Sequence, residues 1–133
     1  MGKVSIVAMT EARERSVARS EAGANYREAK YPVDKFPYFP LDGERLQLFQ
    51  IDLGPDAEVA PHAHTEDEIV YVLTGALLLG ARTVGPGGAV YVAKDTLYGF
   101  KTGPEGCSFL NFRPTDKVGI LNKEQFMAQR AKG

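Results

Sequence analysis

The sequence of 133 residues lacks an excess of charge of either sign. It has 16 lysines and arginines against 17 aspartates and glutamates, a net charge of −1, and no long basic run. Proteins that bind nucleic acid present a concentrated basic surface, so this balance argues against that function. It also argues against a basic helix lying on a membrane. We therefore expect neither nucleic acid nor a membrane among the partners.

Long hydrophobic runs and paired cysteines are missing as well. The longest mostly apolar stretch, Ile69–Ala81, is interrupted by a threonine and two glycines and is far shorter than the roughly 20 residues of a spanning helix. Residues 4–9 are too few for the core of a signal peptide. The single cysteine, Cys107, cannot form an internal disulfide, and we expect it to fill the core as an inert side chain. These features favour a soluble, cytoplasmic protein.

The composition, 44% hydrophobic and 25% charged, predicts one globular domain. Residues 1–40 differ from the rest. They contain a solvated stretch at residues 10–22 and a segment at residues 31–40 whose prolines exclude a helix or an interior strand. We predict that residues 1–40 form an N-terminal arm packed on the core, either on its outer wall or as a lid.

Residues 41–115 have the short apolar runs, broken by Gly, Pro and Asp, that are typical of an all-β barrel or sandwich. The turn signals between these runs predict seven strands: Arg45–Leu53, Glu58–His64, Glu68–Leu73, Ala76–Leu79, Ala89–Ala93, Leu97–Lys101 and Ser108–Arg113. Residues 116–133 predict a tail with one short helix, because Asn122 and Gln125 have the spacing of a capping box.

The two histidines of the chain, His62 and His64, lie two residues apart. In a strand they point to the same face, and a turn at residues 65–67 would bring Glu68 opposite them on an antiparallel strand. Two imidazoles and a carboxylate suit a divalent ion of Fe, Mn, Ni or Zn. The alternative is two exposed histidines beside a solvated acidic turn.

The pattern His62-x-His64-x3-Glu68-x6-Gly75 resembles the first conserved motif of the cupins, a superfamily of small β-barrel proteins. The resemblance covers about Leu46–Pro114. It implies a cupin jelly-roll β-barrel with a short C-terminal helix and an N-terminal arm, and a divalent metal held inside by His62, His64 and Glu68.

The sequence departs from the cupin pattern at its glycines and at the last ligand. The leading glycine of the first motif falls on Asp56, and we expect Gly54 to supply the turn instead. Of the second motif only Gly87 remains; the other positions fall on Ala93, Asp95, Tyr98 and Thr102. Tyr98 replaces the ligand histidine. It can bind a metal as phenolate, donate to a substrate or fill the barrel, and we expect an inward-pointing donor.

The resemblance implies a metal-binding cupin that acts on a small organic molecule, with Tyr98 as the candidate catalytic residue. Oxygenase-like and isomerase or lyase chemistry both remain open, and the alternative is a non-catalytic binder or sensor. Because Ile69, Tyr71 and Leu73 make the strand of Glu68 apolar on its outer face too, a second subunit or the arm must cover that face. We favour a homodimer.

Overall fold

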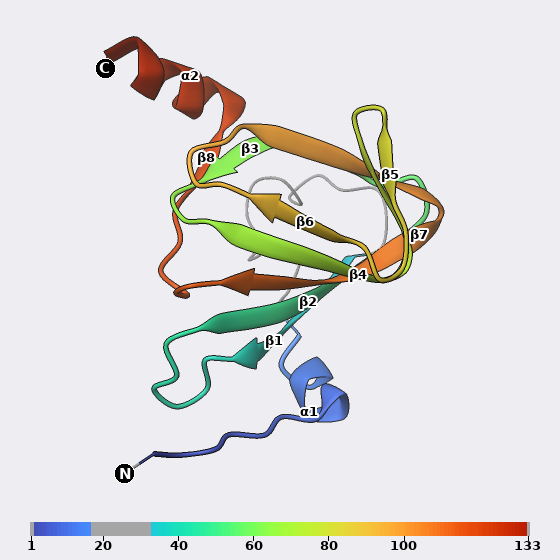
Figure 1. The fold of residues 1–133 in the computed structure, drawn as a ribbon, viewed down its shortest axis with the longest axis vertical. Helices are drawn as coiled ribbons and strands as arrows, with labels where there is room; N and C mark the ends of the chain where they lie inside the picture. Colours follow the sequence, from blue (N-terminus) through green and yellow to red (C-terminus); the bar gives the residue numbers. More distant parts are fainter. Residues whose placement is uncertain (1, 17–32, 133) are drawn as a thin grey trace.

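The computed structural model describes residues 2–16 and 33–132. They form an antiparallel sheet of eight strands that curls around a core, with a helix near each end of the molecule (Figure 1). The elements in order are α1 (Met9–Arg13), β1 (Val33–Phe39), β2 (Gln47–Leu53), β3 (Glu58–His64), β4 (Glu68–Leu79), β5 (Arg82–Val84), β6 (Ala89–Val92), β7 (Tyr98–Arg113), β8 (Ile120–Asn122) and α2 (Lys123–Lys132). None of the described helices is long and apolar enough to cross a membrane.

Strand β7 organises the sheet because it pairs with three other strands. Its first residues pair with β3 and its last seven with β2, while β4 pairs along the other edge. The outer strands follow from there: β1 pairs with β2, β8 with β3, and β5 and β6 with β4. One long strand thus joins both walls of the barrel.

Strands β4 and β7 are each continuous, so the prediction that Gly75 and residues 103–106 separate shorter strands is wrong. Gly75 and Gly106 both have positive φ, 74° and 79°, and they lie side by side. A Cβ at Gly75 would lie 2.1 Å from the carbonyl oxygen of Gly106, and the β4–β7 register shifts beside it. These glycines bend the strands without ending them.

The predicted arm and tail both contribute strands. Residues 33–39 of the arm form the edge strand β1, and residues 17–32 lie outside the described part of the chain. In the tail, β8 precedes α2, whose capping box is confirmed: Gln125 N donates to Asn122 Oδ1 at 2.8 Å, and Asn122 N donates to Gln125 Oε1 at 2.9 Å.

Two aspartates stand where the cupin motifs have glycines, and both adopt the conformation that favours glycine. Asp56 has a φ of 53° and Asp95 a φ of 60°. Aspartate tolerates this left-handed region better than most side chains. The expectation that Gly54 replaces the leading glycine is therefore wrong, because Asp56 makes the turn itself.

The core lies inside the curled sheet. On β4 the side chains alternate: Val70 and Val72 are buried, whereas Ile69 and Tyr71 are 42% and 40% exposed. The buried apolar cluster comprises Phe49, Ile51, Leu53, Ala57, Val59, Val70, Val72, Leu77, Phe100, Cys107 and Phe109. The inner wall is thus largely apolar, and four of the buried polar side chains lie together: His62, His64, Glu68 and Asn111.

Candidate functional site

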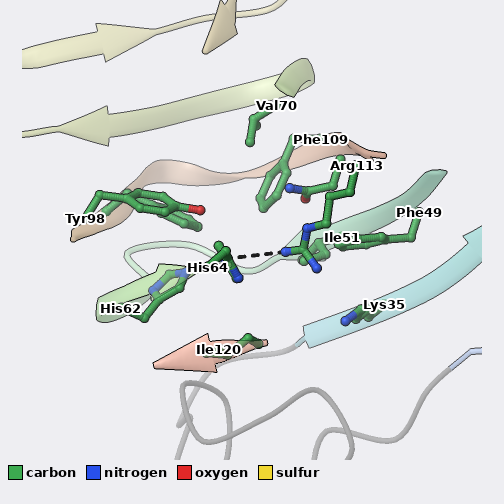
Figure 2. A pocket seen from close by; sticks show the side chains of 12 residues that line it. Lys35, Phe49, Ile51, His62, His64, Val70, Tyr98, Phe109, Arg113 and Ile120 are labelled. Carbon is green, nitrogen blue, oxygen red and sulfur yellow. Dashed lines mark hydrogen bonds between the residues drawn. The ribbon is translucent and has the colours of Figure 1, made fainter. Parts of the chain in front are cut away.

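A pocket inside the barrel brings together polar residues from the ends of several strands (Figure 2). Lys35 comes from β1, His62 and His64 from β3, and Tyr98 and Arg113 from the two ends of β7. The remaining lining residues are Phe49, Ile51, Val70, Phe100, Phe109, Asn111 and Ile120. Glu68 lies beside this pocket, bonded to Arg113.

Both histidines are buried, at 4% and 5% exposure, which excludes the alternative of exposed histidines. Their ring centroids are 4.7 Å apart, edge to face. Burial lowers the pKa of His62, and it lowers the pKa of His64 to about 4. Both rings are therefore neutral at pH 7 and carry one nitrogen lone pair each.

His62 has one ring nitrogen available, whereas His64 Nε2 faces the Arg113 guanidinium, which can only donate to it. His62 Nδ1 lies 2.8 Å from the Ala60 carbonyl oxygen, a contact in which Nδ1–H donates, so Nε2 carries the lone pair. His64 Nε2 lies 3.4 Å from Arg113 Nη2, and His64 Nδ1 is buried without a hydrogen-bond partner in the described part of the chain. A backbone bond of this kind on one ring nitrogen is how proteins orient a metal-binding histidine.

Glu68 is an ionised, fully buried carboxylate held by three donors. Its Oε2 accepts from Arg113 Nε at 2.9 Å and from Asn111 Nδ2 at 3.0 Å, and its Oε1 accepts from the Tyr98 hydroxyl. Burial raises the pKa of Glu68, but the Arg113 guanidinium and the hydrogen bonds from Tyr98 and Arg113 outweigh it, so the pKa lies below its ordinary value. Glu68 is thus negative, with Arg113 as its counter-ion.

These residues fit a metal in donor type and in protonation state, since two neutral imidazoles and an ionised carboxylate are buried together. Within residues 2–16 and 33–132, however, no three His, Cys, Asp or Glu side chains are placed to hold one ion. His64 Nε2 and Glu68 Oε1 are 3.8 Å apart, and both Glu68 oxygens already accept hydrogen bonds, from Tyr98 and Arg113. Glu68 would join the histidines only by exchanging one of these bonds, and the three-ligand site stays a prediction.

Tyr98 lies in the pocket with its ring 4.7 Å from that of His62. The hydroxyl donates to Glu68 Oε1, so it stands next to the candidate ligands rather than outside the barrel. Its catalytic role stays a prediction.

Sequence reasoning missed Lys35, Asn111 and Arg113. The last two follow Phe109 at two-residue steps on β7, and a polar residue at such an inward position is the signal that was available. Lys35 gave no such signal because its segment was predicted to pack on the outer wall of the barrel or to cover it as a lid. Its ammonium lies 4.5 Å from the centre of the Phe49 ring, and burial, followed by Arg113, lowers its pKa to about 8.

Comparison with solved structures identifies the barrel. A polyketide cyclase, RemF, from Streptomyces resistomycificus has 26% identity and a TM-score of 0.62, covering 86% of this chain and 91% of its own. The cupin-2 domain of a transcriptional regulator of the XRE family from Enterobacter cloacae has 26% identity and a TM-score of 0.52, covering 64% and 98%. A cupin-2 domain from Rhodospirillum rubrum has 20% identity and a TM-score of 0.55, covering 76% and 74%.

The chain is assigned to the cupin superfamily. No family model matches the sequence, and no curated protein matches it. The altered second motif and the two aspartates at glycine positions lie in the segments by which cupins are recognised.

Proposed function

We propose that this cupin is a metal-dependent enzyme for a small organic molecule bound inside the barrel. His62 and His64 would hold the ion, with Glu68 as third ligand. The observation that carries the proposal is the burial of two neutral imidazoles beside an ionised carboxylate. When bound, a divalent ion would polarise a carbonyl or enol oxygen of the substrate.

Tyr98 would serve as the acid or base of the reaction, exchanging a proton with a substrate oxygen. Its hydroxyl donates to Glu68 Oε1, so the carboxylate holds this hydroxyl beside the pocket. Arg113 keeps Glu68 ionised, because its guanidinium remains charged at any pH of interest. Proton transfer of this kind serves isomerisation, elimination and ring closure.

The similarity to a polyketide cyclase supports isomerase, lyase or cyclase chemistry over an oxygenase, because that likeness extends over most of both chains. The similarity to a regulator's cupin-2 domain keeps the second candidate, a non-catalytic sensor. Metal-loaded protein that binds a ligand saturably without turnover would favour the sensor, and oxygen uptake during turnover would favour the oxygenase.

The test of the metal is its stoichiometry. We expect about one divalent ion per chain in protein purified without chelators, measured by elemental analysis, and strong loss of metal in His62→Ala and His64→Ala. Glu66→Gln, in the turn next to Glu68, is the matched control and should keep the metal. Protein that contains no metal and takes up none on titration contradicts the proposal.

A further inference from the structure

The pocket lining is positively charged. Lys35 and Arg113 are its cations, both histidines are neutral, and no aspartate or glutamate is among the described lining residues. Glu68, just beyond the lining, neutralises Arg113 through the ion pair at 2.9 Å. One positive charge, that of Lys35, is left over.

The ammonium of Lys35 has no hydrogen bond or salt bridge to any group in residues 2–16 and 33–132. Its described contact is with the face of Phe49, and the Arg113 guanidinium lies over the same ring at 4.8 Å. Figure 2 shows both cations beside Phe49 at one side of the pocket. A partly buried ammonium without an acceptor is costly unless a ligand supplies one.

The surroundings of the two cations define what such a ligand looks like. Phe49, Ile51 and Phe109 give the pocket an apolar wall, which suits a flat apolar group. The cavity volume is about 30 Å³, room for one or two water-sized groups such as the oxygens of a carboxylate, and Ile120 in its lining is 41% exposed. The head group would enter towards the cations while the rest of the molecule stays near the rim.

We propose that Lys35 and Arg113 form a subsite for the carboxylate of a small, partly apolar organic acid. The subsite names the substrate class of the proposed function and rests on it for the idea that the ligand enters this barrel. It does not depend on a metal, because the charges that recognise the acid belong to the chain. A neutral ligand of the same shape would leave Lys35 without an acceptor and bind more weakly.

Calorimetric titration with benzoate and with its neutral analogue benzamide tests the subsite. We expect benzoate to bind at least about tenfold more tightly than benzamide, as for loss of one charge-assisted hydrogen bond. Lys35→Met should weaken benzoate by about the same factor and leave benzamide unchanged. Lys35→Arg should retain the preference, and Lys117→Met, the same change at an exposed lysine, should behave as wild type.

Equal affinity for the two probes, no binding of benzoate, or unchanged benzoate affinity in Lys35→Met would overturn the inference. Each titration is run on chelator-treated and on metal-loaded protein. A Lys35-dependent preference for benzoate in protein that takes up no metal supports the subsite and contradicts the metal-dependent function. Metal uptake with equal affinity for both probes contradicts the subsite and leaves the metal-dependent function standing.

Discussion

The two faces of β4 differ in how far the side chains on them are covered by neighbouring residues. On the inner face, Glu68 is 2% exposed and its oxygens have three donors from β7. On the outer face, Ile69 pairs with Tyr91 and with Phe112, and these three side chains are 42%, 63% and 42% exposed. The inner face is complete within one chain as a charged cluster, whereas the outer face has apolar surface that the described residues do not cover.

Removal of the Glu68 carboxylate from the inner face should cause the largest loss of stability. Glu68→Ala leaves the Arg113 guanidinium buried without a counter-ion, which costs about 3–5 kcal/mol of the free energy of unfolding. Urea denaturation measures the change. Glu66→Ala, two residues earlier in the turn, is the control and should change stability by less than about 1 kcal/mol. A Glu68→Ala variant as stable as wild type would show that the ion pair is not closed in solution.

The outer face is tested by its oligomeric state. We expect a homodimer through the outer face of Ile69, Tyr71, Tyr91 and Phe112, with a mass about twice the 14.5 kDa of the chain by light scattering. Ile69→Lys should give a monomer, because it places a charge in the centre of this face. Met127→Lys, at another exposed apolar residue on α2, should leave the dimer intact. A wild-type monomer at micromolar concentration contradicts the prediction.

Lys35 on the inner side should lower the free energy of unfolding of the ligand-free protein, although we propose that it strengthens binding of an acid. Its pKa of about 8 in the folded chain lies below the ordinary 10.5, so the folded state binds fewer protons than the unfolded state between these pH values. The stability lost by burying the charged Lys35 ammonium is therefore at its largest below pH 8 and disappears as the pH rises towards 10.5. Lys35→Met should raise the free energy of unfolding by about 1–3 kcal/mol at pH 7, and by much less at pH 10.

Urea denaturation at both pH values measures this difference, with Lys117→Met as control. A Lys35→Met variant that is less stable than wild type at pH 7 would contradict it.

The smallest expected effect is on the reactivity of Cys107, which depends only on whether the core around this thiol is closed. Burial raises the pKa of its thiol to about 12, so roughly one molecule in ten thousand is a thiolate at pH 8. Thiol reagents should react slowly with the native protein and at once in denaturant. Complete reaction of the native protein within minutes would contradict a closed barrel at this strand.

The sequence predicted the all-β barrel and the capped helix, because short apolar runs separated by turn residues and a capping box are local signals. It failed at Gly75 and Gly106, since a glycine that ends a strand and one that bends it look alike until the partner strand is known. For the candidate site, the motif named His62, His64 and Glu68 but not Arg113 or Lys35. These depend on which strands face each other across the barrel, and no local spacing records that.

The central position of β7 has a consequence for synthesis. Strands β2, β3 and β4 are all synthesised before β7, with which each of them pairs. The pairing of β2 is complete only when Arg113, the partner of Gln47 at the end of β7, has been synthesised. Until then their edges have no neighbour and are open to other chains. Because Arg113 also supplies the counter-ion of Glu68, the last residue of β7 both closes the barrel wall and neutralises this buried carboxylate. A nascent chain that stops before residue 98 lacks the whole of β7, and we expect it to be recognised by chaperones rather than to fold.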